Sequence, residues 1–225
     1  MLPKVTFYYD IISPYSWIGF ETLLRYQQKQ YFNLKLKPVF LGGIFKETSN
    51  KSPLMVPAKS EYVMKELGLT SDYYGMKIVP PKDFIKTAFT QGSLNALRFL
   101  VALENENEKH LIPASRELWN RLWSRQESAY TENDFIEVGT NIGLNKETID
   151  NVLKNTSSLT VKEKIKTSTM EAVAEGAFGV PWIVVEKADG VKRSFFGSDK
   201  MPLICFFIDK PFLGPLVQNE CKNKL

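Results

Sequence analysis

The sequence predicts an α/β fold in which a βαβ unit is followed by a long helical stretch and then by a ββα unit. Apolar, strand-like runs lie near both ends of the 225-residue chain but are scarce between residues 57 and 165. That middle stretch repeats its apolar residues at helical spacing instead. Because 44% of the residues are apolar, the chain suffices for one large domain or for a core with an inserted subdomain.

The first βαβ unit is predicted within residues 5–40. Residues 5–9 are apolar and aromatic, which favours a strand, and residues 34–40 alternate leucine with lysine before an apolar finish. An amphipathic helix lies between them, near Trp17. Ser13 suits the N-cap of this helix, and Pro14 suits its first position, where a missing N–H costs nothing.

The middle of the chain is predicted to be helical throughout. Leu94, Leu97 and Leu100 form one apolar stripe, and Trp119 and Trp123 belong to a second. We expect both stripes, including the two tryptophans, to pack in the core.

The ββα unit is predicted from two strands, residues 182–185 and 192–196, and a helix over about residues 200–207. Pro181 stands just before the first of these strands, where proline indicates an edge, a turn or a cis bond. Ser198 and Asp199 are residue types that favour a helix start, and the sequence predicts that they begin the last helix. A second helix N-terminus on this side of the sheet would also bind a carboxylate.

The start of the first helix has the chemistry of an anion site. Its free N–H groups and the positive end of its dipole favour a negative charge, as at reactive cysteines on helix N-termini. A free thiol has a pKa of about 8.5, and lowering it by roughly two units needs about 2.7 kcal/mol. In a thioredoxin-type fold this junction carries a Cys-x-x-Cys pair, but here Ser13 and Ser16 occupy both cysteine positions. The sulfur is therefore expected to arrive with a ligand, for which glutathione is the obvious candidate.

Several segments resemble the kappa-class glutathione transferases, in the right order and over nearly the whole chain. They are residues 10–21, 92–100, 115–119, 123–125, 176–181 and 196–199. The resemblance implies a thioredoxin-like domain with an inserted all-helical domain, as in bacterial disulfide oxidoreductases of the DsbA type. It places the thioredoxin-like domain in residues 1–56 and 166–225, and the helical domain in residues 57–165.

The same resemblance implies the site residues. Ser13 matches the catalytic serine, whose hydroxyl donates to the glutathione thiolate. Lys59 falls where the family has a lysine for the glycine carboxylate, and the backbone of Val180 would pair with the cysteinyl part. The full set expected to bind glutathione is Ser13, Pro14, Tyr15, Asn50, Lys59, Val180, Pro181, Ser198 and Asp199, with the last two at the γ-glutamyl end.

The predicted function is that of a glutathione S-transferase, which ionises glutathione and conjugates its thiolate to small electrophiles. A glutathione peroxidase activity is chemically reasonable for the same thiolate. Two alternatives remain open: a thiol–disulfide oxidoreductase or isomerase of the same fold, and a non-catalytic helper of assembly or secretion. The resemblance implies glutathione as co-substrate, no cofactor, and a homodimer.

Other partners are not indicated by the composition. The net charge of +4 is spread out and forms no basic stripe with aromatic residues, so no nucleic acid is expected. No segment has the apolar length of a membrane span. The single histidine, His110, lies in a predicted polar loop, which argues against zinc and histidine-based catalysis. Cys205 is expected to be buried and Cys221 to be a free thiol, with no metal site between them.

The chain ends are expected to bear on localisation. The N-terminus leads straight into the first predicted strand without a secretory signal. Residues 223–225, Asn-Lys-Leu, are close to the peroxisomal address Ser-Lys-Leu. Since the kappa class is associated with peroxisomes and mitochondria, we predict one or both of these, with the cytosol as a further option, and no secretion.

Overall fold

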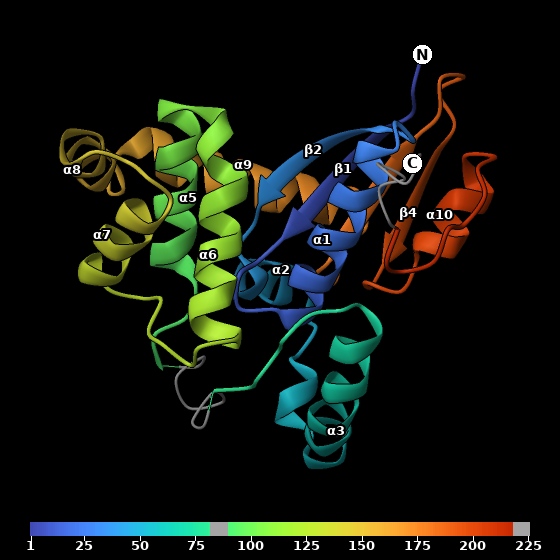
Figure 1. The fold of residues 1–225 in the computed structure, drawn as a ribbon, viewed down its shortest axis with the longest axis horizontal. Coiled ribbons are helices and arrows are strands. Elements are labelled where there is room, and N and C mark those ends of the chain that lie inside the picture. The colour runs from blue at the N-terminus through green and yellow to red at the C-terminus, as the bar shows by residue number, and fades with distance from the viewer. Residues whose placement is uncertain (82–89, 218–225) are drawn as a thin grey trace, which may run out of the picture.

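The two predicted β-containing units are present in the computed structural model, which describes residues 1–81 and 90–217. The first consists of β1 (Lys4–Tyr9), α1 (Pro14–Gln28) and β2 (Asn33–Pro38). The second consists of β3 (Trp182–Glu186), β4 (Lys192–Phe196) and α10 (Met201–Phe207). Figure 1 shows the two units joined in one sheet, although about 140 residues of mainly helical chain separate them.

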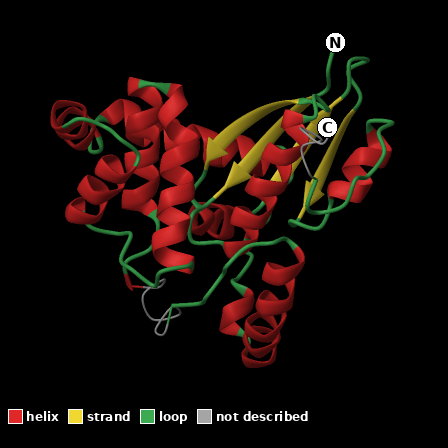
Figure 2. Ribbon diagram, viewed as in Figure 1, coloured by secondary structure: helices red, strands yellow, loops and turns green. Residues whose placement is uncertain are grey.

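The four strands lie in the order β2-β1-β3-β4. Strand β1 is parallel to β2, with Phe7 opposite Leu36, and antiparallel to β3, with Phe7 opposite Ile183. Strands β3 and β4 are antiparallel. This mixed sheet, with helices on both faces (Figure 2), confirms the predicted thioredoxin-like architecture.

The described part of the chain between β2 and β3 is helical, as predicted. Its elements are α2 (Leu41–Thr48), η1 (Pro53–Met55), α3 (Pro57–Tyr73), α5 (Leu94–Glu106), η2 (Glu108–His110), α6 (Leu111–Trp123), α7 (Glu132–Asn141), α8 (Lys146–Asn155) and α9 (Leu159–Ala174). Helices α5–α8 form a lobe beside the sheet, whereas α3 stands apart below it (Figure 1). His110 lies in the polar 3₁₀ turn η2, which joins α5 to α6, and it is half-buried.

Each face of the sheet packs against a different set of helices. Phe7 and Tyr9 of β1 point into the larger core, formed with α1, α5, α6 and α10. Tyr8, between them, points to the opposite face and packs with Ile44 of α2 and Ala172 of α9. This alternation follows from the two-residue period of a strand. It places α1 and α2, the two helices that start beside the end of β1, on opposite faces.

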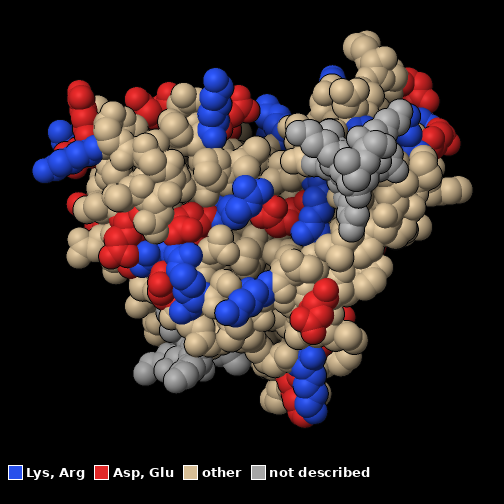
Figure 3. Space-filling model, viewed as in Figure 1, with Lys and Arg blue, Asp and Glu red and all other residues tan. Residues whose placement is uncertain are grey.

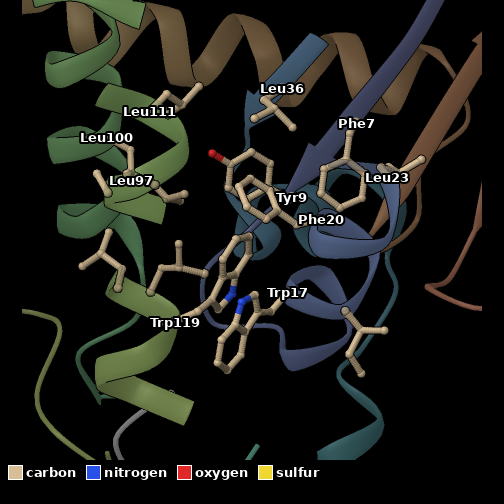
Figure 4. Packing of buried hydrophobic residues seen from close by; sticks show 14 of the residues in the cluster. Phe7, Tyr9, Trp17, Phe20, Leu23, Leu36, Leu97, Leu100, Leu111 and Trp119 are labelled. Carbon is tan, nitrogen blue, oxygen red and sulfur yellow. The ribbon is translucent and has the colours of Figure 1, made fainter. Parts of the chain in front are cut away.

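The tryptophans of the middle segment are core residues, as expected. Trp119 and Trp123 are 0% and 1% exposed. The indole of Trp119 stacks on that of Trp17 with ring centroids 6.4 Å apart, and it meets the ring of Phe20 edge-on (Figure 4). One core therefore joins α1 to the helical lobe.

The division into a thioredoxin-like domain and an inserted domain stays a prediction. Helix α9 is continuous across residue 165, where the predicted boundary lies, and it packs against both α2 and α5.

The chain after α10 returns to α1. The hydroxyl of Tyr26 donates to the carbonyl of Gly214 and accepts from the N–H of Leu213, and Tyr31 donates to the carbonyl of Pro211. Cys205 is buried, as expected. Cys221 and residues 223–225 lie outside the described residues.

The surface charges are mixed. On the face in Figure 3, basic and acidic side chains are interspersed over most elements. Among the described residues, no helix combines the length and the apolar character needed to cross a bilayer.

Candidate active site

A cleft of about 990 Å³ opens between α3, the N-terminus of α1 and the loops before β3 and after β4. Of the nine residues predicted to bind glutathione, eight line it: Ser13, Pro14, Tyr15, Asn50, Val180, Pro181, Ser198 and Asp199. These residues come from four separate stretches of the chain. The fold thus brings together segments that the sequence linked only through a resemblance.

Ser13 occupies the N-cap of α1, with Pro14 at the start of the helix, as predicted. Its hydroxyl accepts a 3.1 Å hydrogen bond from the N–H of Ser16, and the residue is 8% exposed. A hydroxyl that accepts with a lone pair still has its own proton to donate. Ser13 can therefore donate to an anion in the cleft while it caps the helix, whose dipole acts in the same direction.

The loop before β3 forms a second part of the cleft wall. The Val180–Pro181 peptide bond is cis, one of the three possibilities predicted for this position. A Cβ on Gly19 would lie 3.2 Å from the ring of Phe7 and 3.6 Å from Pro181, so the glycine lets α1 approach both. Within the described residues, the backbone of Val180 makes no hydrogen bond, while the carbonyl of Pro181 accepts one from Gly197. Val180 thus has a free N–H and C=O beside the cleft, as pairing with a peptide-like ligand requires.

Asn50 lies just beyond α2 and reaches this loop. Its side-chain amide donates a 2.7 Å hydrogen bond to the carbonyl of Phe178, and its Oδ1 accepts from the N–H of Lys51. Asn50 therefore positions the segment that leads to Val180. One N–H of the amide stays available for a ligand.

Tyr15 extends from the first turn of α1 towards α3. Its hydroxyl donates a 2.7 Å hydrogen bond to Oε2 of Glu66. Burial and the neighbouring Glu66 carboxylate raise the pKa of Tyr15 well above its usual value, so the phenol keeps its proton. Because that proton is engaged, Tyr15 offers a ligand its ring and backbone rather than a hydroxyl donor.

Ser198 and Asp199 line the cleft, but they do not begin a helix. They form a turn after β4, and α10 starts at Met201 with Lys200 as an N-cap that makes no side-chain bond. The helix predicted over about residues 200–207 is confirmed, but Ser198 and Asp199 do not cap it: Gly197, at φ +105°, turns the chain before them, and Pro202 lies in the first turn of a helix capped by Lys200. The carboxylate site predicted at a helix N-terminus formed by Ser198 and Asp199 is therefore not present, because these two residues do not begin α10. The Asp199 side chain is 67% exposed and pairs with Lys200.

Lys59 is the predicted residue that the fold leaves outside the cleft lining. It is exposed in the first turn of α3. The Lys59 side chain contacts solvent, and its assignment to the glycine carboxylate stays a prediction.

Asp10 lines the cleft and was given no role by the sequence, although it begins the motif that contains Ser13. It is 0% exposed, and its carboxylate accepts from the N–H groups of Ile12 and Leu41 and from the hydroxyl of Ser93. Burial raises its pKa to about 6, against the lowering effect of these hydrogen bonds. Its partners lie up to 83 residues away, so no local pattern could have identified it.

The cleft suits polar chemistry at one place and apolar contact elsewhere. The donors gather around Ser13 and Val180, while α3 and η1 contribute apolar side chains that include Leu54, Val63, Met64 and Leu67. Within residues 1–81 and 90–217, no three His, Cys, Asp or Glu side chains are grouped as metal ligands would be. The arrangement can hold an anionic sulfur at α1 and an apolar molecule beside it.

Comparison with known proteins agrees over almost the whole chain. Residues 4–205 match the DSBA-like thioredoxin domain family. Glutathione S-transferase kappa 1 of Rattus norvegicus is 38% identical over 209 residues, which cover 93% of this chain and 92% of the relative. Glutathione S-transferase kappa 1 of Homo sapiens is 38% identical over 216 residues, covering 96% and 95%.

A solved structure of 2-hydroxychromene-2-carboxylate isomerase shares the fold. It superposes with a TM-score of 0.72 at 19% sequence identity, and the match covers 92% of this chain and 94% of the isomerase.

Proposed function

The chain belongs to the kappa class of glutathione S-transferases, within the DSBA-like thioredoxin family, and we propose that it ionises glutathione at Ser13 and transfers the thiolate to an apolar electrophile. The family membership makes it a glutathione transferase with glutathione as co-substrate. The roles of individual residues are proposed from the geometry of the cleft.

The observation that carries the proposal is the hydrogen bonding of Ser13. Since its hydroxyl already accepts from the N–H of Ser16, the orientation that remains is donation into the cleft. A thiolate held there receives one charge-assisted hydrogen bond and the favourable end of the α1 dipole. Together these lower the pKa of the thiol and raise the fraction of nucleophile at neutral pH.

The tripeptide is proposed to bind along the loops on the sheet side of the cleft. The free backbone groups of Val180 pair with the cysteinyl unit, and Asn50 supplies a further N–H. Ser198 and Asp199 lie at the other end, where the Asp199 carboxylate pairs with the γ-glutamyl amine in place of Lys200. Holding the ligand at several points converts the reaction into an effectively intramolecular one.

The electrophile is proposed to occupy the apolar part of the cleft, against α3. With an aryl halide, the thiolate sulfur forms a bond to the ring carbon, the carbon–halogen bond breaks, and halide leaves with the electron pair. The thiol proton is lost to solvent on binding, so the protein does not have to supply an acid.

The alternative of a thiol–disulfide oxidoreductase is disfavoured by the residues at the site. Disulfide exchange needs a protein thiolate, and Ser13 and Ser16 occupy both positions where it would stand. A non-catalytic helper that uses the cleft only for binding remains as the second candidate.

The test is conjugation itself. The full-length chain is mixed with glutathione and 1-chloro-2,4-dinitrobenzene, and product absorbance is followed against a no-enzyme blank. Saturable, enzyme-dependent product formation supports the transferase. Glutathione binding by calorimetry without any turnover supports the helper, and absence of both contradicts the proposal.

Three further expectations stay predictions. They are a homodimer, a location in peroxisomes or mitochondria, and peroxidase activity with lipid hydroperoxides. Analytical ultracentrifugation, imaging of fluorescent fusions, and a coupled peroxidase assay test them in turn.

A further inference from the structure

Asp10 joins the starts of three helices. The N–H of Ser13 donates to its carbonyl at 3.1 Å, and the N–H of Ile12 donates to Oδ1 at 3.1 Å. These bonds close the turn that leads into α1. Oδ2 accepts from the N–H of Leu41, the first residue of α2, at 2.9 Å, and from the hydroxyl of Ser93, the N-cap of α5, at 2.7 Å.

Two of these helices lack a cap of their own. Phe40, the N-cap of α2, makes no side-chain hydrogen bond, and neither does Ser93 to α5. The Asp10 carboxylate takes over this role for α2, because it accepts one of the N–H groups that a helix start leaves unpaired. Asp10 thereby sets the position of α2 relative to the Ser13 turn.

Helix α2 then connects Asp10 to the other wall of the cleft. It is eight residues long and is followed by Asn50, which holds the carbonyl of Phe178 at 2.7 Å. A short, continuous path thus runs from Ser13 through Asp10, α2 and Asn50 to the loop of Val180. The residue that donates to sulfur and the residue that pairs with the peptide are placed by the same carboxylate.

The geometry favours an ionised carboxylate. The N–H groups of Ile12 and Leu41 can only donate, so a proton on the carboxylate could be accepted only by the Ser93 hydroxyl, and only after that hydroxyl reverses its own hydrogen bond. Among the described residues, Asp10 has no basic partner. The titratable groups near enough to feel its charge include Tyr9 and Tyr130, and the Asp10 carboxylate contributes to the raised pKa values of both phenols.

We propose that Asp10 is a positioning residue for the proposed glutathione conjugation. Its ionised carboxylate fixes the position of the Ser13 turn relative to α2 and the Val180 loop, and its protonation weakens the hydrogen bonds that do so. Turnover therefore requires two deprotonated groups, the glutathione thiol and Asp10. Burial raises the pKa of Asp10 to about 6, so the loss of its proton falls within the pH range in which turnover can be measured.

The experiment is the pH dependence of kcat between about pH 4.5 and 8, with saturating glutathione and 1-chloro-2,4-dinitrobenzene. In the wild type, log kcat is expected to fall towards acid pH with a slope approaching 2. Asp10→Asn is expected to fall with a slope of 1 and to have a plateau lower by on the order of tenfold. Far-UV circular dichroism at each pH checks that both proteins stay folded.

Ser93→Ala is the matched variant. It removes one hydrogen bond that lowers the pKa of Asp10, so the acidic limb should move to higher pH while its slope stays 2. A purely structural role for Asp10 would lower kcat without changing any slope. A slope of 1 in the wild type, or a slope of 2 in Asp10→Asn, would overturn the proposal.

A second readout does not depend on turnover. Glutathione affinity is measured by calorimetry at pH 7.5 for the wild type and for Asp10→Asn, and we expect it to be several-fold weaker in the variant because α2 and Asn50 shift. If the wild type binds glutathione but catalyses nothing, the transferase proposal fails while this comparison still decides the role of Asp10. Equal affinity in the two proteins would then contradict that role.

Discussion

The hydroxyl of Tyr15 donates a 2.7 Å hydrogen bond to Oε2 of Glu66, which ties the first turn of α1 to the middle of α3. Two further bonds hold the end of this segment: Arg25 donates to the carbonyl of Tyr74, and Tyr74 donates to that of Ser198 over 3.5 Å. Helix α3 forms the apolar wall of the cleft. We therefore expect its attachment at Tyr15 to affect the binding of the electrophile more than the pKa of the glutathione thiol.

We predict that Tyr15→Phe raises KM for the electrophile several-fold and leaves the pH profile of turnover in place. The lost hydrogen bond should also lower the free energy of unfolding by about 1 kcal/mol. Steady-state kinetics with varied electrophile and thermal unfolding measure both effects. Glu66→Gln keeps an acceptor for the phenol, so its KM should lie closer to the wild type. A shifted pH profile with unchanged KM in Tyr15→Phe would show that the hydroxyl acts on the sulfur instead.

Asn50→Ala is predicted to weaken glutathione binding about five- to tenfold, since it removes both a ligand N–H and the bond to Phe178. Calorimetric titration provides the measurement. Asn105→Ala is the control, because Asn105 is likewise an exposed asparagine, accepts a hydrogen bond from Lys164 and lies away from the cleft. Equal affinities in the two variants would remove Asn50 from the site.

Asp199→Ala is predicted to weaken glutathione binding without changing the pKa of the bound thiol. Asp199 is exposed and pairs with Lys200, which suits an exchange of partner for the γ-glutamyl amine. Lys200→Ala leaves the carboxylate without a competitor and should bind at least as tightly as the wild type. Wild-type affinity in Asp199→Ala, or a moved thiol pKa, contradicts this division of roles.

We predict that the free energy of unfolding depends on pH through the titration of Asp10. Its pKa is raised from 3.8 to about 6 in the folded protein, so between these values the folded state binds more protons than the unfolded state. The free energy of unfolding therefore decreases as pH rises from about 4 to about 6, by up to roughly 3 kcal/mol from this group. Above pH 6 its contribution is constant.

Urea unfolding at several pH values isolates this contribution as the difference between the wild type and Asp10→Asn. The wild type should lose stability relative to the variant as pH rises from 4 to 6. A difference that is constant over this range would mean that the pKa of Asp10 is not raised in the fold.

The parts of the site that the sequence predicted are those set by neighbouring residues. A serine followed by a proline at a helix start is a local pattern, and Ser13 and Pro14 occupy the predicted positions of α1. The apolar run over residues 5–9 is equally local, and the strand predicted there is β1. Both could be derived because the backbone geometry of a strand or a helix start involves only a few residues.

The parts that failed depend on contacts distant in sequence or on backbone angles. Ser198 and Asp199 lie in a turn after Gly197, and Lys200 takes the N-cap position of α10 that was predicted for them. The role of Asp10 depends on Leu41 and Ser93, which lie 31 and 83 residues away from it along the chain. No periodicity or spacing encodes such contacts.

The central claim is that the Ser13 hydroxyl stabilises the thiolate of bound glutathione. The most direct measurement is a pH titration of thiolate absorbance near 240 nm for glutathione bound to the wild type and to Ser13→Ala, with kcat followed in parallel. We predict that Ser13→Ala keeps most of its glutathione affinity, titrates at a higher pH, and turns over on the order of 10–100-fold more slowly. An unchanged thiol titration together with unchanged turnover in Ser13→Ala would contradict the account.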